Sequence, residues 1–405
     1  MKKLLKRLGL LWVATLVGLL AAEVTVRLAG LGEKGSIGHL YRADSTLGWA
    51  HRPDVSYVHV TGEYTVKWRF NASGIRRDND VALEKHGPRI VVLGDSHTAG
   101  HGVEAEQTYA ARLESLLREA GRDVEVLNFG VDGYTTTQEY LWCKMEAPRW
   151  QPDVVILGVY LANDLLENFE PLGLGGYSRP LVDASLAVLP APGRAPNSVV
   201  EPEGLWARSK EWLASHSHLY VFAGNRLKGT VVGRWLADAE LIRGLPDDLT
   251  LDVIRACQGC WGQLLGELVG LARRQGGEDE VISRLVELLV AIDADCRTRS
   301  AHCLVALIPS RLEVEEHCAG VKEACEMLEL KGDPLETVRG LRARVVGRLR
   351  ERGLEPLDLA PPAERHFARY GNPLYFARDW HVNAEGHELV AQEILAALME
   401  RGWVE

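Results

Sequence analysis

The sequence has no excess of positive charge. Its 405 residues hold 46 Lys and Arg against 56 Asp and Glu, a formal net charge of −10. A broadly basic surface that could grip a phosphate backbone is not expected, so we predict no nucleic-acid partner. With 46% hydrophobic residues and no internal repeat, the chain is neither disordered nor fibrous. We expect one large domain with an insertion, or two smaller domains.

Cysteine is scarce, and its pattern does not favour a metal or redox centre. The segment CQGC at 257–260 has no second CxxC at zinc-ribbon spacing, and no thioredoxin-like strand precedes it. A local disulfide or buried thiols are the simpler expectation there. An odd number of cysteines leaves at least one free or paired between chains. The seven are Cys143, Cys257, Cys260, Cys296, Cys303, Cys318 and Cys325.

A membrane segment is predicted at the N-terminus. Four cations within residues 2–7 precede an uncharged run from Leu8 to Ala22, which is how a segment with a cytoplasmic N-terminus looks. Fifteen residues are fewer than the roughly 20 that a spanning helix needs. The run reaches that length if it continues to Ala29 past Glu23 and Arg27, which are four apart and can pair.

We therefore predict an uncleaved anchor within residues 1–30 and a chain that otherwise lies outside the cytoplasm, on the periplasmic or cell-surface side. The alternative is a cleavable signal peptide, because Leu20, Ala21 and Ala22 offer small residues at a plausible cleavage site. In either case the cysteines lie where disulfides can persist.

The rest of the chain predicts an α/β fold. After a β-rich lead-in at 41–88, short apolar runs alternate with helical patterns, which is typical of a three-layer α/β/α domain with a central parallel sheet. We assign 89–170 and 300–405 to this domain, and 171–299 to a helical insertion. Expected strands are 89–94, 124–130, 153–160, 302–310 and 354–359, and expected helices 106–121, 135–147, 333–353 and 383–402.

Chemically useful side chains follow the predicted strands. Ser96 stands two residues past the first strand, and a serine needs a base to become a nucleophile. His381 in RDWHVNAEGH is the candidate base, and Asp379 would orient its ring and stabilise the imidazolium. Because ligands gather beyond the carboxyl ends of parallel strands, we expect these three side chains to meet at one sheet edge.

Donors for an oxyanion are predicted at the same edge. Gly133 in NFGVDGYTT can bring its backbone N–H close to a ligand, and Asn163 in VYLANDLLEN can donate from its amide. The backbone N–H of Ser96 is a third donor. Read singly, Asn163 fits an ordinary turn residue.

Four sequence blocks together resemble the SGNH/GDSL hydrolase family. They are GDSHT, GVDGYTT, LAND and DWHVN, in the family's order, and the lead-in GEYTVKWRFNASGIR resembles membrane-anchored bacterial members. The resemblance covers about residues 41–168 and 300–395. It implies a flavodoxin-like fold, Ser96 as nucleophile, His381 as base, Asp379 as its partner, and an oxyanion hole of Ser96, Gly133 and Asn163.

Two positions depart from the family pattern. Leu161 stands where the asparagine block usually has Gly, which would narrow the entrance. The last block is Asp-x-His, not the commoner Asp-x-x-His, a spacing also seen in polysaccharide O-acetyltransferases that resemble this family. This spacing keeps acyl transfer open as a reaction.

Several nearby residues have structural interpretations. Asp95 would bind turn amides, Asp164 would cap the following segment, and Asn383 would cap the last helix. His97, His101 and His387 are expected on the surface or in packing, with His97 also a candidate for the pocket wall. The insertion's Trp206, Trp212, Trp235 and Trp261 fit packing better than sugar stacking.

The leading hypothesis is an extracytoplasmic, membrane-anchored serine esterase that removes an acyl group, with acetyl a candidate, from a glycan or lipid. No metal or organic cofactor is expected. The alternatives are a polysaccharide O-acetyltransferase with the same triad and an envelope protein that binds glycan without catalysis.

Overall fold

The computed structural model describes residues 2–28, 40–61, 63–189, 277–315, 334–377 and 379–404, and a few residues between 209 and 223. The chain divides into two compact units. One comprises residues 1–39, 57–66 and 200–247, and the other residues 40–56, 67–199 and 248–405. The CQGC segment, Cys318, Cys325 and the insertion tryptophans Trp206, Trp212, Trp235 and Trp261 lie outside the described residues.

The first unit contains helix α1 (Lys2–Leu28), which carries an apolar stretch of 20 residues, Gly9–Leu28, with a mean hydropathy of 1.9. By length and composition it suits a membrane anchor or a signal sequence. The predicted pair of Glu23 and Arg27 is confirmed, with 2.6 Å between Oε1 and Nε. Glu23 also accepts hydrogen bonds from the backbone N–H groups of His218 and Leu219 at 3.0 and 2.9 Å.

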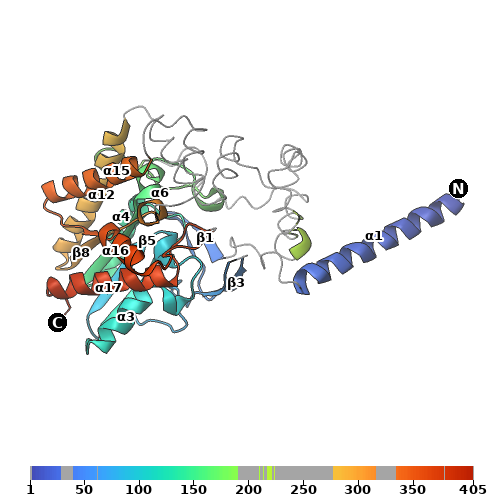
Figure 1. Ribbon diagram of the computed structural model, residues 1–405, viewed down its shortest axis with the longest axis horizontal. Helices are drawn as coiled ribbons and strands as arrows, with labels where there is room; N and C mark the ends of the chain where they lie inside the picture. The colour runs from blue at the N-terminus through green and yellow to red at the C-terminus, as the bar shows by residue number, and fades with distance from the viewer. Residues whose placement is uncertain are drawn as a thin grey trace. The chain divides into compact units, whose positions relative to one another are not determined.

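The second unit is built on a parallel sheet of five strands (Figure 1). In order of appearance its strands are arranged 2-1-3-4-5, the flavodoxin-like order. The apolar strands β5 (Arg89–Gly94) and β7 (Val154–Tyr160) are buried along their whole length, as a sheet covered on both faces requires. The predicted parallel α/β sheet is confirmed. Across the sheet the strands are β6 (Glu125–Asn128), β5 (Arg89–Gly94), β7 (Val154–Tyr160), β8 (His302–Ile308) and β9 (Leu357–Asp358).

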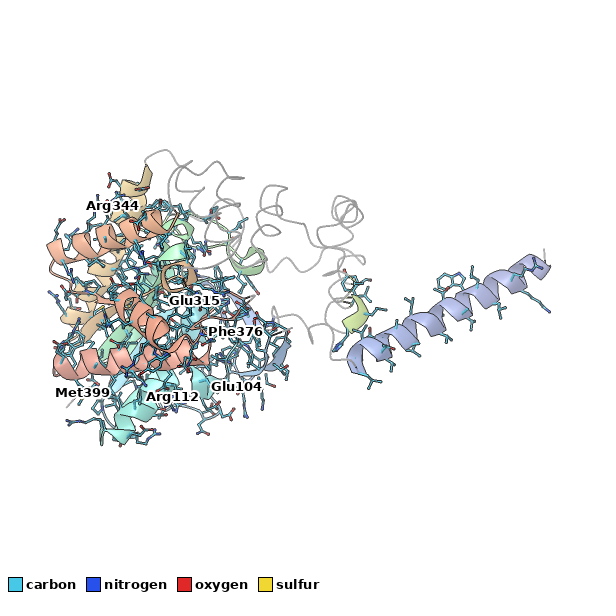
Figure 2. All side chains as sticks on the ribbon, in the orientation of Figure 1. Glu104, Arg112, Glu315, Arg344, Phe376 and Met399 are labelled. Carbon is cyan, nitrogen blue, oxygen red and sulfur yellow. The ribbon has the colours of Figure 1, made fainter. Side chains whose placement is uncertain are left out.

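Helices cover both faces of this sheet (Figure 1). On one face, alternate strand residues such as Ile90 and Ile156 share a core with Leu113 of α3 (Tyr109–Glu119) and Ile394 of α17 (Ala384–Glu400). Arg112, labelled in Figure 2, joins α3 to α17 through Glu388 at 2.5 Å. Helix α16 (Ala360–Tyr370) adds Ala363 to the same core. The helices predicted at 106–121 and 383–402 are therefore confirmed as α3 and α17.

On the other face, α4 (Thr136–Met145) packs against α12 (Gly277–Thr298), which contacts β8 and α15 (Pro334–Glu351). The sequence assigned α12 to the insertion, but the structure packs this helix on the sheet. Its periodicity predicted a helix and could not show which surface the apolar face covers. Three of these elements hold buried free thiols: Cys143 in α4, Cys296 in α12 and Cys303 in β8.

The lead-in segment braces the loop that follows β5. Strands β1 (Tyr41–Asp44) and β2 (Gly48–His51) pair antiparallel, and β4 (Thr65–Arg69) buries alternate residues, including Trp68. The Arg76 guanidinium lies 3.9 Å from the centre of the Trp68 ring and donates to the carbonyls of Ala99 and Gly100 at 2.6 and 2.5 Å. The lead-in thus fixes the backbone beside Ser96.

The chain also has shorter elements, of which α2, α6 and α13 directly follow β5, β7 and β8. They are β3 (Ser56–Val60), α2 (Ser96–Ala99), α5 (Ala147–Trp150), α6 (Leu161–Glu167), α13 (Arg311–Val314) and the 3₁₀ turns Ala105–Gln107 and Leu174–Gly176.

Candidate active site

Ser96 is the first residue of α2, directly beyond β5. Gly94, at φ +154°, permits the tight turn, because a Cβ there would lie 2.0 Å from Thr98 Oγ1 and 2.8 Å from the Gly158 carbonyl. Asp95 caps α2, its Oδ1 accepting the His97 N–H at 2.9 Å, which is the structural role expected of it. The turn therefore holds the Ser96 hydroxyl at the switch point between β5 and β7.

Ser96, His381 and Asp379 form a continuous chain of hydrogen bonds. His381 Nε2 lies 2.7 Å from Ser96 Oγ, and His381 Nδ1 lies 2.5 Å from Asp379 Oδ1. The backbone N–H of His381 also donates to Asp379 Oδ1 at 3.1 Å. With Asp-x-His spacing the carboxylate therefore reaches both the ring and the backbone N–H of His381.

The environment of His381 favours its neutral form. Burial lowers the pKa of His381 below its ordinary value, the charge of His101 lowers it further, and the hydrogen bond to Asp379 opposes both effects. A neutral imidazole beside a serine hydroxyl can accept its proton.

The loop that carries His381 is fixed from two sides. Asn383 caps α17 by accepting the Gly386 N–H at 3.1 Å, which confirms its predicted cap role, and its amide donates to the Pro373 carbonyl at 2.8 Å. The Phe376 N–H donates to the His381 carbonyl at 3.1 Å. These bonds limit the motion of the imidazole relative to Ser96.

The expected oxyanion donors follow the neighbouring strands. Asn163, in α6 after β7, is buried and donates from Nδ2 to Asp95 Oδ2 at 2.8 Å. Because an amide nitrogen carries two hydrogens, this bond orients the group without using both. Gly133, after β6, has φ +73°, a conformation that favours glycine. Burial raises the pKa of Asp95 to about 7.

Aromatic rings surround the imidazole of His381. The ring centroids of Trp380 and His97 lie 4.1 and 4.9 Å from it, and His97 also stacks on Tyr160 at 4.0 Å. The packing role expected for His97 is confirmed, as it is for buried His387, whose Nδ1 accepts the Tyr109 N–H at 3.1 Å.

His101 also packs inside the molecule, and it lies against His381. Its ring stacks on His381 with centroids 4.3 Å apart, and its Nδ1 lies 3.5 Å from Asp132 Oδ1. Sequence reasoning missed both residues and Trp380. The available signal was position: Asp132 adjoins Gly133, Trp380 adjoins His381, and His101 lies in the turn after Ser96.

Within the described residues, one group has the spacing of a metal site. His101, Asp379 and His381 each place a donor atom within 4.8 Å of the others. The donors of Asp379 and His381 are already joined by a 2.5 Å hydrogen bond, so we assign the group to the hydrogen-bonded chain described above.

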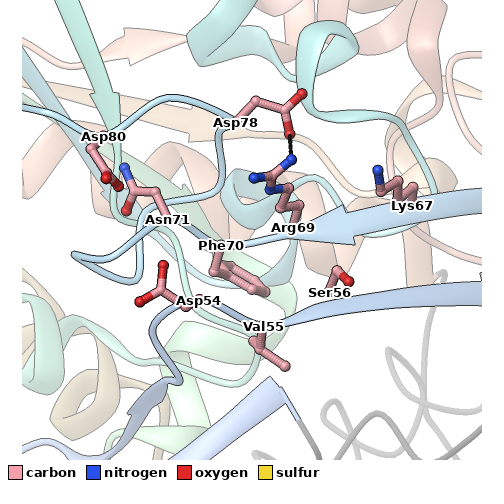
Figure 3. A pocket seen from close by; sticks show the side chains of 9 residues that line it. All are labelled: Asp54, Val55, Ser56, Lys67, Arg69, Phe70, Asn71, Asp78 and Asp80. Carbon is pink, nitrogen blue, oxygen red and sulfur yellow. Dashed lines mark ion pairs between the residues drawn. The ribbon is translucent and has the colours of Figure 1, made fainter.

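A separate pocket lies in the lead-in segment (Figure 3). It is lined by charged residues that include Asp54, Asp78, Asp80 and Arg69, with Arg69 paired to Asp78 at 3.5 Å. None of the three residues in the hydrogen-bonded chain lines it, so this pocket is distinct from the candidate active site.

Comparisons with known proteins found one family model and one curated relative that match parts of the chain. Residues 92–213 match the GDSL-like lipase/acylhydrolase family model. An arylesterase of Vibrio mimicus is 32% identical over 90 residues, which are 22% of this chain and 44% of that protein. The match therefore spans less than half the length of that relative.

Solved structures of similar topology include two esterases. Acetyl xylan esterase AlAXEase is 12% identical, with 76% of this chain and 99% of that chain covered and a TM-score of 0.38. An acetylxylan esterase from Geobacillus stearothermophilus is 11% identical, with 80% and 99% covered and a TM-score of 0.39. At these identities the likeness does not extend to substrate.

Proposed function

We propose, from the match of residues 92–213 to the GDSL-like lipase/acylhydrolase family model, that this chain is a serine ester hydrolase with Ser96 as its nucleophile. The observation that carries the proposal is the chain of hydrogen bonds from Ser96 Oγ through His381 to Asp379, at 2.7 and 2.5 Å. A serine hydroxyl bonded to a neutral imidazole that is itself oriented by a carboxylate has the geometry of an activated nucleophile.

In this mechanism Ser96 Oγ attacks the ester carbonyl as His381 Nε2 takes its proton. Asp379 stabilises the imidazolium, and the proton passes to the leaving alcohol when the tetrahedral intermediate collapses. The Ser96 N–H, the Gly133 N–H and the Asn163 amide donate to the oxyanion. A water molecule, deprotonated by His381, then hydrolyses the acyl-enzyme.

The proposal extends to the substrate class and the location. We infer an acyl ester, with acetyl a candidate, on a glycan or lipid outside the cytoplasm, with α1 holding the chain at the membrane. The apolar stretch Gly9–Leu28 supports the membrane location. The relative named as an arylesterase makes an aryl acetate the first assay substrate.

The test uses the full chain in detergent. We expect purified protein to hydrolyse p-nitrophenyl acetate and to react covalently with a fluorophosphonate, and we expect Ser96→Ala to abolish both while leaving the fold intact by circular dichroism. Thr61→Ala, in the lead-in turn, is the hydroxyl-removing control and retains both activities.

Two outcomes would redirect the proposal. A folded wild-type protein that does not label is a non-catalytic binding protein. A protein that labels but passes acetyl to an added sugar faster than to water is an acyltransferase, the reaction that the Asp-x-His spacing also allows.

A further inference from the structure

A second histidine–carboxylate pair lies against the imidazole of His381. The His101 ring is 4.3 Å from the His381 ring, centroid to centroid, with 24° between their planes. His101 also contacts Asp132, with 3.5 Å between His101 Nδ1 and Asp132 Oδ1. The arrangement is Asp132, His101 and His381 in series, beside the separate pair of Asp379 and His381.

The backbone holds this pair at a fixed position relative to the nucleophile. The His101 N–H donates to the Ser96 carbonyl at 3.0 Å, so the turn that presents Ser96 also places His101. Asp132 is buried, its side chain accepts a hydrogen bond from the Tyr41 hydroxyl, and its carbonyl accepts one from Trp49 Nε1 at 3.0 Å. Neither partner is a freely moving surface charge.

The groups that face His101 come from three parts of the second unit. Asp132 follows β6, Asp379 and His381 precede α17, Arg76 comes from the lead-in, and Tyr41 lies behind Asp132. Burial opposes a charge on His101, but the interactions with Asp132 outweigh it and raise the pKa of His101 above its ordinary value. His97 and His387 also face His381, and burial lowers the pKa of each.

We propose that His101, paired with Asp132 and stacked on His381, is a positioning residue that holds His381 neutral in the resting enzyme, so that the catalytic base stays available in mildly acidic medium. This proposal rests on the proposed esterase function. A cation stacked on an imidazole disfavours protonation of that imidazole, because two like charges a few ångströms apart repel in a site shielded from water.

The substitution His101→Gln removes the cation and keeps a polar side chain. We expect the acidic limb of the pH profile of kcat/KM to move to higher pH by about one unit. On that limb the variant's kcat/KM should be about tenfold below that of the wild type, and at higher pH the two should differ little. Asp132→Asn should shift the limb in the same direction but by less, because Asp132 itself also raises the pKa of His381.

The matched control is His366→Gln, which removes a histidine of α16 that pairs with Glu385 and lies outside the site. Its pH profile should coincide with that of the wild type. A merely structural role for His101 would lower activity equally at all pH values and would leave the position of the limb unchanged.

A second readout does not depend on turnover. In protein labelled with ¹³C at histidine Cε1, the His381 resonance, assigned with His381→Gln, should titrate at higher pH in His101→Gln than in the wild type. An unchanged titration overturns the proposal. If Ser96→Ala abolishes activity while His101→Gln keeps the wild-type profile, the proposed function stands and this inference fails. If His101→Gln does not fold, Asp132→Asn decides by the same readouts.

Discussion

Arg342 of α15 is the structural centre of a buried ion network at the carboxyl end of β8. Its guanidinium donates to both oxygens of Glu313, at 2.5 and 3.1 Å, and to Asp358 at 3.1 Å. It also donates to the carbonyls of Leu307 and Ile308 at 3.2 and 3.0 Å. Side-chain exposure is 6% for Arg342 and 2% for Glu313, so solvent screens this pair little.

The substitution Arg342→Met keeps most of the volume and removes the charge. It leaves the Glu313 carboxylate and two carbonyls without this partner in a buried site. Removal of one partner of a buried ion pair costs about 3–5 kcal/mol, and each unpaired carbonyl adds about 1 kcal/mol. Proton uptake by Glu313 relieves part of this cost, so we expect a loss of about 4 kcal/mol at pH 7.

The dependence on pH provides a sharper check. In the wild type, burial works against the charge of Glu313, but Arg342 outweighs it and lowers the pKa of Glu313. That contribution is present above the unfolded-state pKa and is lost as the pH falls through the folded-state pKa. Without Arg342, burial raises the pKa of Glu313, so the variant's deficit shrinks at acidic pH by up to about 1.4 kcal/mol per pH unit.

The assay is urea unfolding of wild type and variant at pH 7 and pH 5, followed by circular dichroism. Arg339→Met is the matched control from the same helix, because Arg339 is 34% exposed and its loss should cost less than about 1 kcal/mol. A loss below about 1 kcal/mol for Arg342→Met, or an equal loss at both pH values, would refute the reasoning.

Two further predictions concern the site and the helical layer. Asp379→Asn should lower kcat for aryl acetate hydrolysis by about a thousandfold or more, because the ring of His381 loses its orienting carboxylate; steady-state kinetics giving less than a tenfold loss would contradict that role. Native protein should not react with a maleimide at the thiols of α4, α12 and β8, and should do so after unfolding, since buried thiols are inert; mass spectrometry of the native adducts checks Cys143, Cys296 and Cys303.

Much of the fold was predictable because its signals are local. The strands around Val91 and Val155 are unbroken apolar runs, and Thr108 and Gly121 bracket α3 as a side-chain cap and a left-handed glycine at φ +76°. Helix α16 was not predicted, because its first turn contains two prolines that also fit a loop. Those prolines occupy the start of the helix, where a missing N–H costs nothing.

The candidate site divides in the same way. The sequence placed Ser96 and His381 at one sheet edge because parallel strands bring their carboxyl ends together, and their atoms lie 2.7 Å apart. The stacking of His101 on His381 was not predictable, since it depends on how two loops pass each other. The partners of Arg342 were hidden for the same reason, because α15, β8 and β9 meet only in the folded chain.

Because 285 positions separate Ser96 from His381, the proposed catalysis depends on a fully folded chain. The proposed nucleophile lies in α2, directly after β5, and the proposed base lies in the loop before α17, so fraying of α17 alone would part them while most secondary structure persisted. On gradual heating, ester cleavage should therefore disappear before the helical signal does. Activity would then report loss of the native fold at a lower temperature than circular dichroism, which averages over all helices.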